Sequence, residues 1–156
     1  MFKLNRLTDY AVVALAHMVR GGARVQTAPQ IARECGVPLP TISKILAALG
    51  QAGIVQAQRG AAGGYTLARP AAAISMADVI EALEGPIALT ACVEGTEEHC
   101  VVETLCPMRG NWNRVNRAIR TALDGVTLAE MASVDGWAMD FNQDRTRAVA
   151  RLPVGE

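Results

Sequence analysis

The feature that most constrains the fold is a glycine-rich turn at residues 59–64, with the sequence Arg-Gly-Ala-Ala-Gly-Gly. The short runs on either side of this turn, residues 54–58 and 65–68, are rich in residues that favour strands. Two such runs around a glycine-rich turn predict a β-hairpin. The hairpin has a basic residue, Arg59, at its tip.

Two helices are predicted in the first 36 residues. The first covers residues 8–20, with Thr8 as its N-cap and two glycines after its last residue. The second begins after Thr27, where Gln30 occupies the position that completes a capping box. It ends at Cys35-Gly36, because glycine commonly terminates helices.

A third helix is predicted over residues 41–52. Its apolar stripe consists of Ile42, Ile45, Leu46 and Leu49. Three helices followed by a basic-tipped hairpin have the element order of a winged helix-turn-helix, in which the third helix enters the major groove of DNA. The predicted fold class is therefore mostly α with a small β-hairpin.

Polar and glycine residues on the third helix and the hairpin are the candidate contacts to DNA. They are Thr41, Ser43, Lys44, Arg59, Gly60, Gly63 and Gly64. The first residues of a recognition helix contact base edges, and a basic wing tip contacts the backbone or a minor groove. The alternatives are plain packing for the helix and an ordinary surface turn for the hairpin. A nucleotide-binding phosphate loop is a weaker interpretation, because the turn lacks the Gly-Lys-Ser/Thr ending.

The second half of the chain predicts a helix over residues 76–84, a longer helix over 109–123 and a helical turn over 127–132. The longer helix has an apolar stripe made of Trp112, Val115, Ile119, Ala122 and Leu123. A second copy of this helix in a homodimer is the simplest partner for the stripe, and a palindromic DNA site would match the twofold symmetry. Packing onto its own domain is the alternative, and both can hold at once.

This pattern divides the chain into four regions. Residues 1–70 are the predicted DNA-binding domain, and residues 71–108 contain a helix and a cysteine-rich loop. Residues 109–134 contain the predicted dimerisation helix and the short terminal helix. Residues 135–156 are expected to be a loosely structured tail without an assigned role.

Charge is divided unevenly along a chain whose formal net charge is zero. Residues 1–70 carry eight Lys or Arg and two Asp or Glu, whereas residues 71–108 carry seven acids and no base. This division indicates a part that binds a polyanion and a part that senses a signal, with chance variation among solvated faces as the alternative. Because no early apolar run is long enough to span a bilayer, we expect a cytoplasmic protein with no membrane partner and no small-molecule substrate.

Three of the four cysteines lie in one acidic loop, at Cys92, Cys100 and Cys106. A reducing compartment makes structural disulfides improbable, which leaves metal or redox chemistry. The spacing lacks the close Cys-x2-4-Cys pair typical of zinc sites and suits an iron–sulfur cluster held by thiolates. The neighbouring acids raise the pKa of a thiol, which argues against a reactive-cysteine enzyme. Cys35 is expected to be a small buried residue, and His17 a packed or surface histidine.

Together these motifs resemble the Rrf2 family of bacterial transcription regulators, over roughly residues 1–133. The matching stretches are Leu7-Thr-Asp-Tyr-Ala11, Gly36-Val-Pro-Leu-Pro, Arg59-Gly-Ala-Ala-Gly-Gly-Tyr65, Ile74-Ser-Met-Ala-Asp-Val-Ile80, Glu84-Gly-Pro-Ile-Ala-Leu-Thr90, the three cysteines and Thr127-Leu-Ala. Within the family, Ala-Leu-Thr-Ala-Cys92 and the stretch from Arg109 to Ile119 most resemble regulators of the Suf iron–sulfur assembly operon.

The resemblance implies an iron–sulfur cluster, [2Fe-2S] or [4Fe-4S], bound by the three loop cysteines and a fourth ligand that varies between branches. Regulators of the Isc operon use a histidine at the position that is Arg109 here, and arginine cannot be a ligand. The nitric oxide-sensing branch uses an N-terminal aspartate from the other subunit, and Asp9 matches it. Asp9 is therefore the preferred fourth ligand and His99 the alternative, although Asp9 could equally be only a helix-terminal acid.

The leading hypothesis is a homodimeric repressor that binds double-stranded DNA and responds to cluster status at iron–sulfur assembly genes of the Suf or Isc type. The main alternative is the same fold acting as a nitric oxide or redox sensor. A structural module stabilised by zinc and a thiol redox enzyme are weaker hypotheses. We do not expect the protein to be an enzyme.

Overall fold

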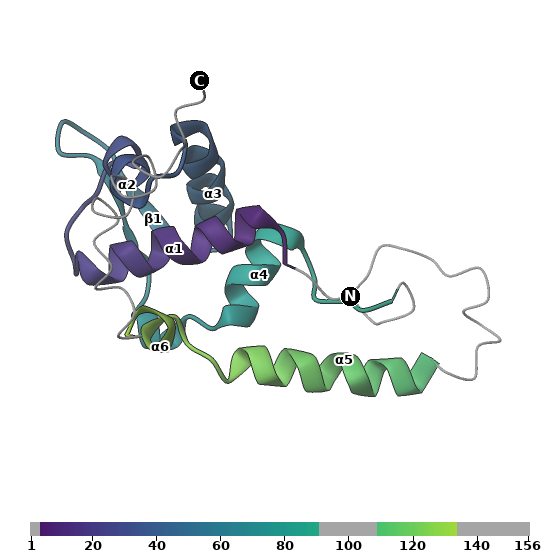
Figure 1. Ribbon diagram of the computed structural model, residues 1–156. Coiled ribbons are helices and arrows are strands. Elements are labelled where there is room, and N and C mark those ends of the chain that lie inside the picture. The colour runs from purple at the N-terminus through teal and green to yellow at the C-terminus, as the bar shows by residue number, and fades with distance from the viewer. Residues whose placement is uncertain (1–3, 91–108, 134–156) are drawn as a thin grey trace, which may run out of the picture.

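The computed structural model describes residues 4–90 and 109–133, and shows a mostly helical protein with one antiparallel hairpin (Figure 1). The elements are α1 (Arg6–Arg20), α2 (Ala28–Cys35), α3 (Leu39–Gln51), β1 (Val55–Gln58), β2 (Gly64–Leu67), a short 3-10 turn η1 (Ala71–Ala73), α4 (Met76–Glu84), α5 (Arg109–Asp124) and α6 (Leu128–Ala132). The predicted fold class, a winged helix-turn-helix, is confirmed. The predicted tail, residues 135–156, lies outside the described residues.

The core forms where α1, α2, α3 and α4 meet. Its fully buried side chains include Leu15, Ile31, Ile42, Ile45, Leu49, Ile54 and Val79. All four residues of the predicted α3 stripe are buried, which confirms the periodicity argument. The opposite side of α3 is therefore free to meet a partner.

Two predicted helix starts are wrong, and both helices begin two residues earlier. The N-cap of α1 is Asn5, whose side chain accepts a hydrogen bond from Leu7 N at 3.1 Å. Thr8 is fully buried and donates its hydroxyl to Glu84 Oε1 at 2.5 Å, so it is not available as a cap. Helix α3 begins at Leu39 after Pro38, which places Thr41 inside its first turn.

The hairpin pairs β1 with β2 in the register Val55↔Leu67 and Gln58↔Gly64. A third segment extends this small sheet, because Gln26 and Tyr65 exchange both backbone hydrogen bonds, at 2.8 and 3.0 Å. The segment that leads into α2 is therefore hydrogen-bonded to strand β2 of the wing. The wing and the helix-turn-helix consequently form one structural unit.

The second half of the chain packs against α1 and α4. Ser75 caps α4 in a capping box with Asp78, and the chain after α5 pairs with residues 74–76 so that Leu128 is fully buried. Helix α5 lies along the edge of the molecule, away from α2 and α3 (Figure 1). None of the described helices is long and apolar enough to cross a membrane.

Candidate nucleic-acid interface

The outward side of α3 presents two of the three polar residues predicted to contact DNA. Ser43 and Lys44 are exposed, one turn into the helix. Thr41 is half-buried, because it lies closer to the core side of the first turn. Ser43 and Lys44 are thus better placed for base or phosphate contacts than Thr41.

The tip of the wing is a five-residue turn between Gln58 and Gly64. Arg59 and Gly60 are exposed there, and Gly60 has a φ of 111°, a conformation that favours glycine. The other two glycines are required by close packing. A Cβ at Gly63 would lie 2.6 Å from Gln58 O, and a Cβ at Gly64 would lie 2.6 Å from Gln26 O. Their role in the structure is therefore to close the hairpin and admit the Gln26 segment.

The sequence from α3 through the wing contains no carboxylate. No Asp or Glu occurs between Glu34 and Asp78, so the charged residues from α3 to the end of the wing are Lys44, Arg59 and Arg69. Within the described residues, Lys44 and Arg59 form no ion pair, whereas Arg69 donates to Asp78 Oδ2 at 3.0 Å and to Ala73 O at 2.9 Å. Arg69 thus anchors the base of the wing to α4, and the other two cations remain available to an anionic partner.

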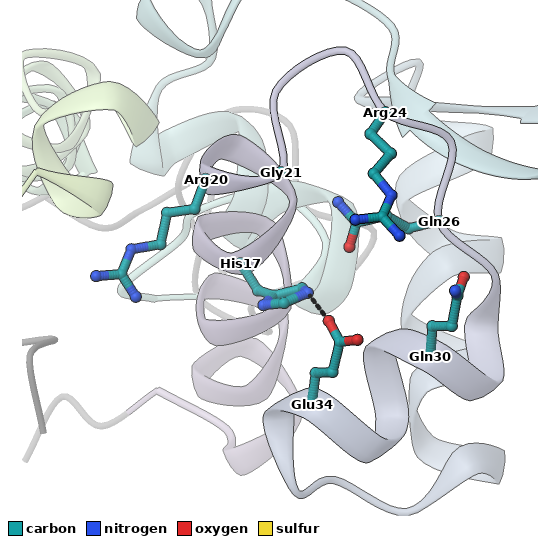
Figure 2. A pocket seen from close by; sticks show the side chains of 7 residues that line it. All are labelled: His17, Arg20, Gly21, Arg24, Gln26, Gln30 and Glu34. Atoms are coloured by element: carbon teal, nitrogen blue, oxygen red, sulfur yellow. Dashed lines mark ion pairs between the residues drawn. The ribbon is translucent and has the colours of Figure 1, made fainter. Parts of the chain in front are cut away.

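A polar pocket of about 370 Å³ lies between α1, α2 and the segment that connects them (Figure 2). His17 from α1 contacts Glu34 from α2, with 2.8 Å between Nε2 and Oε2. The side-chain oxygen of Gln26 is buried near them and has no hydrogen-bond partner in the described part of the chain. His17 is therefore a half-exposed surface histidine, as expected, and it links α1 to the helix-turn-helix.

Cys35 at the end of α2 is a half-buried free cysteine. Burial, together with the neighbouring Glu34 carboxylate, raises the pKa of its thiol from 9.0 to about 11. A thiol in this state is a poor nucleophile and a poor metal ligand at neutral pH. Cys35 packs against the core but is only half-buried, whereas the sequence predicts a buried residue.

The candidate ligands Cys92, Cys100, Cys106 and His99 lie outside the described residues. Asp9, the preferred fourth ligand, is exposed in the first turns of α1. That end of α1 adjoins the end of α4, because Glu84 accepts hydrogen bonds from Asn5 N at 2.9 Å and from Thr8 Oγ1. In residues 4–90 and 109–133, no three His, Cys, Asp or Glu side chains gather as a metal site.

Asn116 of α5 holds the chain that leads to the cysteine loop. Its side chain is buried, donates to Ile87 O at 2.8 Å and accepts from Leu89 N at 3.2 Å. Asn116 and Glu84 are not among the candidate residues predicted from the sequence, because each contacts a segment far away in the sequence. The signal available for Asn116 was its position beside the apolar stripe of α5, where a polar residue needs a partner.

Comparisons with known proteins agree with this geometry. A family model described as "Rrf2: Iron-dependent Transcriptional regulator" matches residues 4–133. Protein aau3 of Rhizobium meliloti (strain 1021) is 33% identical over 129 residues, which are 83% of this chain and 84% of the relative.

Two solved structures of named regulators are also similar. CymR, the global cysteine regulator of B. subtilis, is 29% identical with a TM-score of 0.64, over 85% of this chain and 98% of CymR. IscR of T. potens is 26% identical with a TM-score of 0.60, over 99% of this chain and 94% of IscR.

Proposed function

The chain belongs to the Rrf2 family of transcriptional regulators, and from this premise we propose that it is a DNA-binding repressor of iron–sulfur assembly genes, of the Suf or Isc type, that binds an iron–sulfur cluster. Members of the family are transcription regulators, so the chain is not an enzyme. The observation that carries the DNA-binding part of this proposal is the absence of any carboxylate from α3 and the wing, where Lys44 and Arg59 are exposed without partners among the described residues.

In this proposal α3 lies in the major groove and the wing lies beside it. Ser43 and Lys44 contact base edges or phosphates, and Arg59 contacts a phosphate or the minor groove. Thr41 contributes less to the contact with DNA, because its side chain is half-buried. Gly60, Gly63 and Gly64 keep the wing narrow enough to approach the duplex.

Helix α5 supplies the surface for a homodimer. Ile119 and Leu123 pack against Ala77, Ile80 and Ile87 of the same chain. Trp112 and Val115, nearer the N-terminal end of the same stripe, are 40% and 44% exposed. Exposed apolar residues next to a packed stripe favour a second copy of the helix as their partner, and a twofold dimer would bind a palindromic operator.

The donor set of the cysteine loop fits an iron–sulfur cluster. Cys92, Cys100 and Cys106 would provide three thiolates, and Asp9 would provide the fourth ligand, with His99 as the alternative. When the iron–sulfur cluster is bound, bonds between its iron atoms and these thiolates would hold it in the loop. The residues of this chain that would relay the loop's state are Glu84, which joins α4 to α1, and Asn116, which holds residues 87–89 against α5.

Purification without oxygen tests the cluster. We expect a brown protein with charge-transfer absorption, matching amounts of iron and sulfide, and a change in operator affinity after the cluster is removed. A colourless protein that binds zinc, or one whose affinity for DNA does not change, would contradict cluster sensing and leave the DNA-binding function intact.

Paired substitutions test the fourth ligand. Asp9→Ala is expected to destabilise the cluster more than His99→Ala, measured as the rate at which the visible absorption decays in air. The reverse order would assign the fourth position to His99.

A nitric oxide or redox sensor is the second candidate function, and the exposed position of Asp9 favours it. The two functions differ in the signal. The test compares two rates: the loss of DNA binding after a stoichiometric dose of nitric oxide, and the loss of the cluster in air. If the nitric oxide effect is faster, the sensor is favoured over the assembly regulator.

A further inference from the structure

The first turn of α3 presents hydrocarbon at the place where recognition helices usually present polar groups. Pro38, Leu39 and Pro40 are all exposed, and Leu39 is one of the most exposed large apolar residues, at 43%. The helix has no side-chain cap, and neither proline has a backbone N–H to donate. This end of α3 therefore offers few hydrogen-bond donors to a base edge.

Small side chains continue the surface along the helix. Ser43 and Ala47 follow Leu39 at intervals of four residues, so the three lie on one side of α3, and both are exposed. Gly50 is exposed near the end of the helix, and nothing lies within 4 Å of the Cβ position there. Lys44 is the only charged residue of α3. A helix with this outline can lie deep in a groove.

We propose that α3 recognises its DNA site through apolar contact with thymine methyl groups, with Leu39 as the principal contact. The inference rests on the proposed DNA-binding function. The C5-methyl of thymine is the apolar group that a base pair presents in the major groove, while the other edges present hydrogen-bonding groups. The first residues of a recognition helix are the ones that contact base edges, and here the side chain nearest that end with substantial apolar area is Leu39.

The competing occupant of this surface is another protein molecule. DNA is favoured because the surface shares α3 with the exposed Lys44, and because no carboxylate occurs in the sequence between Glu34 and Asp78. An apolar contact flanked by cations matches a methyl group flanked by phosphates.

The test begins with selection of binding sites from random duplex DNA by the full-length protein. Each thymine of the selected half-site is then replaced by deoxyuridine, which removes the methyl group and keeps the hydrogen-bonding pattern. Loss of one contacted methyl is expected to weaken binding about fourfold. Thymines outside the half-site are the control, and their replacement is expected to have no effect.

A protein substitution identifies the residue that makes the contact. Leu39→Ala should weaken binding to the thymine site about as much as deoxyuridine does, and should remove the difference between thymine and deoxyuridine. Leu4→Ala is the matched control, because Leu4 is exposed to a similar extent, 39%, and lies before α1. The Leu4→Ala variant should discriminate between thymine and deoxyuridine as strongly as the wild type does.

Three results are distinguishable. This inference would be overturned if deoxyuridine did not change the affinity of the wild-type protein, or if the selected half-site contained no thymine. DNA binding would remain established in both cases. Full discrimination retained by Leu39→Ala would overturn the assignment to Leu39. Failure to enrich any sequence would overturn the proposed function itself, and the inference with it.

Discussion

Two arginines that look alike in the sequence have different roles in the structure. Arg69 is held by Asp78 and the carbonyl of Ala73, and so connects the wing to α4. Arg59 is exposed at the wing tip, where no carboxylate is near it in the sequence. Neighbouring groups, and not the residue type, decide which cation remains available to DNA.

Cys35 should resist alkylation. Because burial and Glu34 raise its thiol pKa from 9.0 to about 11, the folded protein has about a hundredfold less thiolate at Cys35 below pH 9 than an ordinary thiol. Labelling with iodoacetamide at pH 8, followed by mass spectrometry, should modify Cys35 only after denaturation. Rapid modification in the native protein would contradict the packing role.

Thr8→Val should destabilise the fold. The substitution keeps the shape of a fully buried side chain but removes the hydroxyl that donates to Glu84. We expect a loss of about 1–2 kcal/mol in the free energy of unfolding, measured by urea denaturation. Thr121→Val, on the exposed surface of α5, is the control and should change that free energy by less than about 0.5 kcal/mol. Equal effects of the two would show that the Glu84 contact contributes nothing.

At the level of elements, the apolar stripe of α5 has two parts with different partners. The C-terminal part is covered by α4, with Arg120 donating to Glu81 at 2.5 Å beside Ile119 and Leu123. The N-terminal part, with Trp112 and Val115, has no apolar cover in the described part of the chain. The predicted alternatives for this stripe, internal packing and dimerisation, thus involve different residues of one helix.

Val115→Asp should convert the proposed dimer into a monomer. A charge at the centre of an apolar interface would have to be desolvated without a partner. Sedimentation equilibrium should show the monomer mass, while circular dichroism should retain the helical signal. Arg114→Asp, on the polar side of α5, should stay dimeric. A dimer that survives Val115→Asp would place the interface elsewhere.

Local signals predicted the elements well. The capping boxes that start α2 and α4 depend on residues three positions apart, so the sequence places these starts correctly. The predicted start of α1 is wrong because Thr8 binds Glu84, 76 residues away, and does not cap the helix. Leu39 was missed as a candidate contact because the predicted α3 began at residue 41 and left it in a turn.

In the molecule as a whole, α1 connects the proposed sensing end to the DNA-binding end. Its N-terminus contacts Glu84 at the end of α4, and His17 near its C-terminus contacts Glu34 in α2. Fifteen residues of helix extend about 22 Å. A change at the root of the cysteine loop can therefore reach the helix-turn-helix through one rigid element.

Glu84→Gln tests this connection. A neutral amide keeps the shape but weakens the hydrogen bonds with Asn5 and Thr8, because charge-assisted bonds are stronger. We expect the ratio of operator affinities with and without cluster to move towards one, measured by fluorescence anisotropy. An unchanged ratio would show that the signal does not pass through this contact.

Binding to the operator as a function of salt tests the DNA interface most directly. Arg59→Ala should weaken binding and reduce the magnitude of the log–log slope by about 0.9 for each wing in contact. Arg114→Ala, which removes an exposed cation on α5, should reproduce the wild-type slope. Equal slopes for the wild type and Arg59→Ala would contradict a wing that contacts phosphate, and the proposed face of α3 and the wing with it.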